Sequence, residues 1–165
     1  MDVFTIFLFV GVFCIIGATK DLSNGWNPYI NWKTLEEAEK ESEETNKPIM
    51  LVIHKSWCGA CRALQPQFAA SVKIERLSSN FLMVNTLDDD EPKGEKYLPD
   101  GGYIPRILFI HKGEVREDLY NEAGNPKYKY YYYAPNDILT TMEKAIKTFN
   151  LGDEENNEDR VVDEL

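Results

Sequence analysis

Apolar and polar blocks alternate along the middle of the chain and predict a series of strands. The continuous apolar run at 49–53 is typical of a strand buried on both faces, and the apolar run at 81–84 predicts a second strand. A third strand is predicted at 106–110, which is apolar after Arg106. The Lys112-Gly113 pair predicts a hairpin turn into a fourth strand over 114–120. The pattern therefore predicts a largely buried sheet.

Helical periodicity appears before, between and after these strands. Thr34 and Glu37 have the spacing of a capping box, which predicts a helix start. Residues 58–78 predict a second helix, kinked at Pro66; its apolar face would carry Leu64, Phe68 and Val72. A last helix should open near Pro135, with the apolar face Ile138, Met142, Ile146 and Phe149. The order predicts an α/β fold, a mixed central β-sheet flanked by helices, with an N-terminal helical extension.

The amino end has the pattern of an export signal. Residues 3–18 are apolar and uncharged, but this stretch is shorter than the roughly 20 residues that a spanning helix needs. An apolar core followed by small residues predicts a secretory signal peptide over 1–18, cleaved after Ala18. An uncleaved membrane anchor is the alternative, because the leading charge is Asp2 rather than a basic residue. Cleavage would remove Cys14 and leave Cys58 and Cys61.

The carboxyl end has the pattern of a retention signal. The last four residues, Val162, Asp163, Glu164 and Leu165, differ from Lys-Asp-Glu-Leu only in the first. Residues 151–165 are acidic, which is typical of a disordered, solvated tail that a retention receptor could grasp. We therefore expect a single domain over 19–150 in the lumen of the endoplasmic reticulum, where disulfides form.

Composition narrows the possible partners. The 165 residues include 28 Asp and Glu against 18 Lys and Arg, for a net charge of −10. Phosphate backbones and anionic lipids attract clustered basic residues. We expect no nucleic-acid partner, and no membrane partner once the signal peptide is removed.

The candidate chemistry lies in Cys58-Gly59-Ala60-Cys61, which follows a buried strand and opens a helix. This spacing allows the two sulfurs to form a disulfide. The partial positive charge at a helix amino end stabilises a thiolate on the first cysteine. With Cys58 exposed at the edge and Cys61 one turn further in, Cys58 is the expected nucleophile and Cys61 the resolving thiol.

Three other interpretations of the pair remain open. Half of a zinc site would need further ligands, and the mature chain adds only His54 and His111, so we expect no metal. A static structural disulfide is possible, although so short a loop stabilises weakly. The pair could also be a relic on a module that mainly binds clients.

The stretch 57–61, after an apolar strand and with Pro66 five residues beyond the second cysteine, resembles the thioredoxin fold. Ile104-Pro105 before a strand agrees, because thioredoxin-like proteins have a cis X-Pro there that faces the disulfide. Residues 54–61 and 101–109, the acidic loop and the tail are similar to small thioredoxin-fold proteins of the reticulum, related to the anterior gradient and protein disulfide isomerase families. This likeness covers roughly residues 30–150.

The resemblance implies a protein-disulfide oxidoreductase that acts on cysteine-containing secretory proteins without a cofactor. Glutathione or another thiol oxidoreductase would be its redox partner. Cys58 would form the mixed disulfide and Cys61 would resolve it. The supporting residues would be Trp57, which shields the site, Gly59 and Ala60 between the cysteines, and Ile104 and Pro105, which hold the client backbone.

The chain also departs from these families. Ala60 stands where isomerases have His, which predicts a less oxidising couple, and Val52 stands where thioredoxins bury a proton-relaying acid. His54 or Lys55 could replace that acid. The anterior gradient relatives lack the second cysteine, so Cys61 favours a full dithiol cycle. The rival function is a client-binding or quality-control module with little turnover.

Two further segments have two interpretations each. The tyrosines at 128 and 130–133 either pack in the core or form a client-binding surface. The acidic run 88–91 lacks the spaced ligands of a defined calcium site, and we expect it to be solvated.

Overall fold

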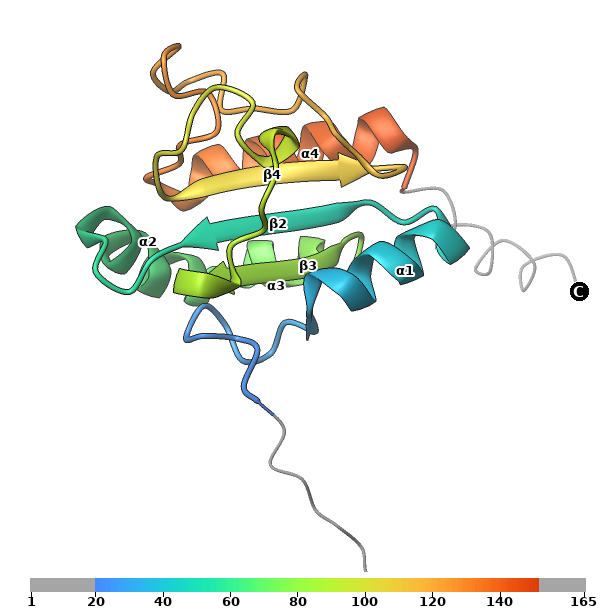
Figure 1. Cartoon of the computed structure of the whole chain (residues 1–165), viewed down its shortest axis with the longest axis horizontal. Helices are drawn as coiled ribbons and strands as arrows, with labels where there is room; N and C mark the ends of the chain where they lie inside the picture. The colour runs from blue at the N-terminus through green and yellow to red at the C-terminus, as the bar shows by residue number, and fades with distance from the viewer. Residues whose placement is uncertain (1–19, 152–165) are drawn as a thin grey trace, which may run out of the picture.

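A five-stranded sheet forms the centre of the protein (Figure 1), seen in a computed structural model that describes residues 20–151. The strands are β1 (Trp32–Lys33), β2 (Ile49–His54), β3 (Leu82–Leu87), β4 (Arg106–His111) and β5 (Glu114–Val115), in the order β1-β3-β2-β4-β5. Strand β2 is parallel to β3 and antiparallel to β4. The predicted mixed sheet and α/β class are therefore confirmed.

Helices cover both faces of this sheet. They are α1 (Leu35–Thr45), α2 (Gly59–Ala69), α3 (Val72–Ser78) and α4 (Pro135–Phe149), with short 3₁₀ turns at η1 (Asp88–Asp90) and η2 (Glu95–Tyr97). Alternate residues of β2 face opposite ways. Met50 and Val52 pack with residues of α2, α3 and α4, whereas Leu51 packs with Ala38 of α1 and with the loops on that side. Every residue of β2 is thus buried.

The predicted helix starts at Thr34 and Pro135 are confirmed. The Glu37 amide donates to Thr34 Oγ1 at 3.2 Å, and the Thr34 amide donates to Glu37 Oε2 at 2.9 Å, which completes the capping box. Pro135 occupies the first turn of α4. Ile138 and Met142 of the predicted apolar face are fully buried.

The single helix predicted over 58–78 is wrong. The helix is interrupted at Ala70–Ser71, and Pro66 lies inside α2. The Ser71 hydroxyl caps a new helix by accepting from the Ile74 amide at 3.3 Å. The side chains of α3 do not continue the periodicity of α2, and Val72 is therefore 76% exposed instead of lying on the same apolar face as Leu64 and Phe68.

The strand predicted over 114–120 is also too long. It ends at Val115, and the Leu119 amide then bonds to the Arg116 carbonyl in a turn. Strand β1 was not predicted, because two residues are too few to show a period.

Several predictions concern segments beyond the described residues. These are the signal peptide over 1–18 with Cys14, almost all of the tail 151–165, and the retention signal 162–165. Among the helices of residues 20–151, none is long and apolar enough to cross a membrane.

Candidate active site

The two cysteines form a disulfide where β2 leads into α2. Cys58 is the N-cap of α2, and its Sγ accepts the Cys61 amide hydrogen at 3.0 Å. The sulfur therefore lies at the positive end of the helix dipole and accepts from a backbone N–H that has no partner within the helix. Both features favour a thiolate at Cys58 after reduction.

The predicted exposure of Cys58 is corrected by the structure. In the disulfide, Cys58 is only 6% exposed and Cys61 2%. One of the atoms that shield Cys58 from solvent is the Ile104 carbonyl oxygen, which lies 3.9 Å from Cys58 Sγ. Because a disulfide sulfur carries no proton, this is a contact and not a hydrogen bond. The Ile104-Pro105 peptide bond is cis and Pro105 is buried. Trp57 is 71% exposed, so most of its ring lies in solvent.

The residues considered as replacements for the missing relay acid have other partners. Val52 lies in the apolar core. His54 Nε2 accepts from Trp26 Nε1 at 3.0 Å, which leaves that nitrogen no proton to give to Asn85 Oδ1 at 3.3 Å. Lys55 Nζ donates to the Asp88 carbonyl at 2.6 Å. His54 is thus bonded within the fold.

Both histidines have a lowered pKa, and this predicts a pH-dependent stability. Burial is the main cause at His54 and at His111; at His54 the nearby Asn85 side-chain oxygen partly opposes it, because it can accept from the protonated ring. The unfolded chain then takes up protons first as the pH falls, so stability is complete above about pH 6.5 and declines below it. Urea unfolding between pH 7.5 and 5.5 should show this decline. His54→Gln and His111→Gln should each flatten it, and equal slopes in all three proteins would contradict the assignment.

The acidic run 88–91 is only partly solvated, which corrects the prediction. Asp88 Oδ1 accepts from the Ser56 amide at 2.8 Å. Glu91 binds Lys55 Nζ and Arg106 Nη2, each at 2.5 Å. The sequence did not reveal Arg106, which is fully buried directly after Pro105.

The tyrosines divide between the two interpretations. Tyr130 and Tyr132 are buried, whereas Tyr128 and Tyr133 are exposed. Tyr128 stacks edge-on against Tyr103, with ring centroids 5.0 Å apart. The Tyr103 hydroxyl donates to Asp100 and accepts from the Tyr130 amide, so this ring next to Ile104 is held firmly.

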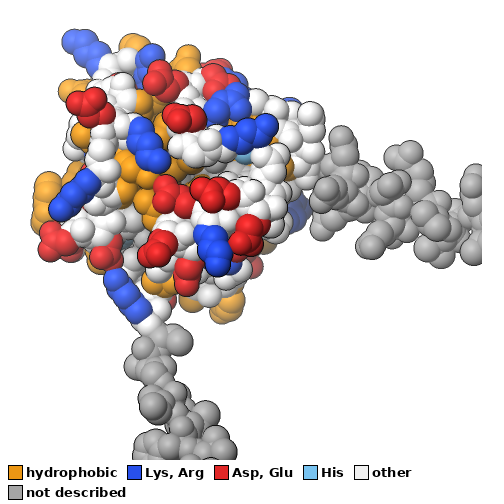
Figure 2. All heavy atoms as spheres, turned by 45° about the vertical axis from the view of Figure 1, so that its right-hand side comes forward, with side chains coloured by type: hydrophobic (Ala, Val, Ile, Leu, Met, Phe, Trp, Pro, Cys, Tyr) orange, Lys and Arg blue, Asp and Glu red, His pale blue; other side chains and the backbone are white. Residues whose placement is uncertain are grey.

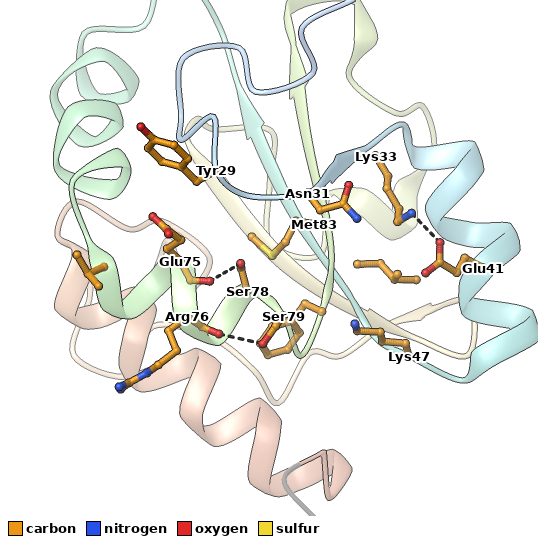
Figure 3. Close-up of a pocket in the computed structure, with 13 residues that line it drawn as sticks. Tyr29, Asn31, Lys33, Glu41, Lys47, Glu75, Arg76, Ser78, Ser79 and Met83 are labelled. Atoms are coloured by element: carbon orange, nitrogen blue, oxygen red, sulfur yellow. Dashed lines mark hydrogen bonds and ion pairs between the residues drawn. The ribbon is translucent and has the colours of Figure 1, made fainter. Parts of the chain in front are cut away.

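A separate groove of about 550 Å³ lies at the β1 edge, between α1 and α3 (Figure 3). Lys33 and Glu41 pair at 2.8 Å on one side of it. Its lining includes neither cysteine, so it is distinct from the disulfide.

Among residues 20–151, no three His, Cys, Asp or Glu side chains are grouped to hold a metal ion. Figure 2 shows acidic and basic side chains interspersed on the face it presents, without a continuous basic surface.

Comparisons with known proteins agree with this fold. A thioredoxin-like family model matches residues 31–112. Anterior gradient protein 2 homolog of Homo sapiens is 36% identical over 132 residues, covering 76% of this chain and 72% of that protein. Anterior gradient protein 3 of Mus musculus is 34% identical, covering 76% of this chain and 77% of that protein.

Two solved structures share the fold. A thioredoxin from Thermus thermophilus has a TM-score of 0.52 at 15% identity, covering 78% of this chain and 96% of that chain. The DsbH oxidoreductase has a TM-score of 0.51 at 20% identity, covering 72% of this chain and 85% of that chain.

Proposed function

The chain belongs to the anterior gradient proteins, within the thioredoxin-like family, and from this we propose that it is a thiol–disulfide oxidoreductase for secretory proteins. One observation carries the proposal: the disulfide sulfur of Cys58 caps α2 and lies beside Ile104 and the cis Pro105. This arrangement places a sulfur that the helix end activates directly beside the Ile104 backbone carbonyl.

The reaction passes two electrons between thiols. The reduced Cys58 thiolate attacks one sulfur of a client disulfide, a mixed disulfide forms, and the other client sulfur leaves as a thiolate. Cys61 then loses its proton and attacks Cys58 Sγ, which releases the reduced client and closes the Cys58–Cys61 bond. The reverse sequence oxidises a client dithiol.

Position 52 offers no carboxylate to accept the proton of Cys61. Val52 cannot accept a proton, and His54 Nε2 is engaged by Trp26. The proton therefore passes to water or to the departing client thiolate. Ala60 adds no charge between the cysteines, so the thiolate of Cys58 depends mainly on the helix end.

We place the reaction in the endoplasmic reticulum lumen. The support is the sequence at the two ends: the apolar segment 3–18 and the retention signal at 162–165. A retention receptor would bind the last four residues. Glutathione or another thiol oxidoreductase would reset the cysteine pair.

The second candidate is a client-binding or quality-control module whose disulfide stays shut. The near-complete burial of both cysteines favours it, because a reducing thiol must reach the sulfur. The two functions differ in the reduction potential of the pair.

Equilibration of the mature domain with glutathione buffers, followed by alkylation, measures that potential. We expect a value near the poise of the lumen, roughly −180 to −210 mV, because the helix end stabilises the reduced form. Such a value lets the pair cycle in both directions. A potential below roughly −300 mV would show a permanently closed bridge and support the binding module.

A further inference from the structure

Glu91 joins the two segments that form the disulfide site. Its Oε2 accepts from Lys55 Nζ and its Oε1 from Arg106 Nη2, each at 2.5 Å. Lys55 lies three residues before Cys58 in the chain, and Arg106 directly follows Pro105. One carboxylate therefore connects the cysteine-bearing loop with the start of β4.

These charges are largely withdrawn from water. The Arg106 side chain is 0% exposed and also donates to the Tyr103 carbonyl, while that of Glu91 is 23% exposed. Burial raises the pKa of Glu91, but the hydrogen bonds from Lys55 and Arg106 outweigh it and hold this pKa below its usual value. Glu91 is thus ionised at neutral pH. A partly buried carboxylate between two cations fixes the geometry of its partners more firmly than an exposed pair.

The same acidic segment also fixes the backbone of the cysteine loop. Asp88 Oδ1 accepts from the Ser56 amide, and its carbonyl accepts from Lys55 Nζ. Asp90 differs, because its partner Lys20 is 65% exposed and Asp90 itself 56% exposed. Neighbouring acids in one run therefore have different roles.

The distance between Cys58 and Ile104 depends on how these two segments are held. Without the Glu91 charge, Lys55 and Arg106 would face each other uncompensated, and their repulsion would favour separation of the segments. A small thiol needs only Cys58. A polypeptide client also needs its backbone aligned with Ile104 and Pro105.

We propose that Glu91 is a positioning residue that sets the spacing between Cys58 and the Ile104-Pro105 segment for polypeptide clients. This inference rests on the proposed oxidoreductase function. It implies that Glu91 affects exchange with a peptide more than exchange with a small thiol.

Glu91→Gln tests this, with Asp90→Asn as the matched control that removes the same charge from the same run. We would measure KM and kcat for a peptide with an internal disulfide, and the rate at which dithiothreitol reduces the oxidised protein. For Glu91→Gln we expect the peptide KM to rise about tenfold. The dithiothreitol rate should change less than about twofold, and Asp90→Asn should change neither by more than that.

The inference is overturned if Glu91→Gln leaves the peptide KM unchanged, or if it lowers peptide and dithiothreitol reactions equally. Should that variant fail to fold, Lys55→Met replaces it, because it breaks one arm and leaves the Arg106–Glu91 pair. The same selective rise in KM is then expected, and its absence is a refutation. A wild-type protein that reacts with dithiothreitol but turns over no peptide would refute the proposed function as well.

Discussion

Replacing Cys61 with Ser is expected to stop turnover and to leave the protein covalently joined to its clients. Cys58 keeps its place at the N-terminus of α2 and still attacks a client disulfide. The serine hydroxyl cannot displace the client from the mixed disulfide, so the second step is lost. We expect turnover of a disulfide peptide to fall by about a thousandfold or more.

Non-reducing electrophoresis and mass spectrometry of the adduct measure this result. The matched control is Cys58→Ser, which also lacks the disulfide but has no nucleophile, so it should form no adduct. Any loss of fold stability from the missing bridge is common to both variants. Noncovalent partner binding that survives in both, with no adduct in Cys61→Ser, would instead support the client-binding module.

Replacing Trp26 with Ala is expected to destabilise the fold by about 3–5 kcal/mol. Trp26 is fully buried, lies edge-on to Phe68 of α2 at 5.1 Å between ring centroids, and donates to His54 of β2. Truncation leaves a cavity against α2 and removes the donor to His54. The residue precedes position 31, where the match to the thioredoxin-like family begins. The loss would therefore show that this preceding segment belongs to the core.

Chemical denaturation monitored by circular dichroism measures the change in the free energy of unfolding. Tyr29→Ala is the control, because it removes a neighbouring aromatic ring that is exposed. It should change stability by less than about 0.5 kcal/mol. A loss below about 1 kcal/mol for Trp26→Ala would contradict its role in the core.

Local sequence signals predicted much of this fold. The capping box at Thr34, the apolar run of β2 and Pro135 at the start of α4 each depend on neighbours within a few residues. Such features follow from backbone preference and from burial. The N-terminal position of the cysteines on α2 is of the same kind.

Long-range pairs could not be predicted in this way. The acidic run gave no sign that Glu91 would bind the buried Arg106 while Asp90 remains exposed, because the difference depends on where β4 lies. The bond from Trp26 to His54 spans 28 positions. Ser71 is a detectable signal, since serine is a preferred N-cap residue, but the only bend expected in this region was a kink at Pro66.

The short edge strands of the sheet limit how far this protein can pair with strands of other chains. Strands β1 and β5 are each two residues long, so a foreign strand finds little backbone to extend. Unfolded secretory chains carry unpaired strands that add readily to open sheet edges. Under the function proposed above, these short edges would let the protein contact a misfolded client without adding to an aggregate through strand pairing.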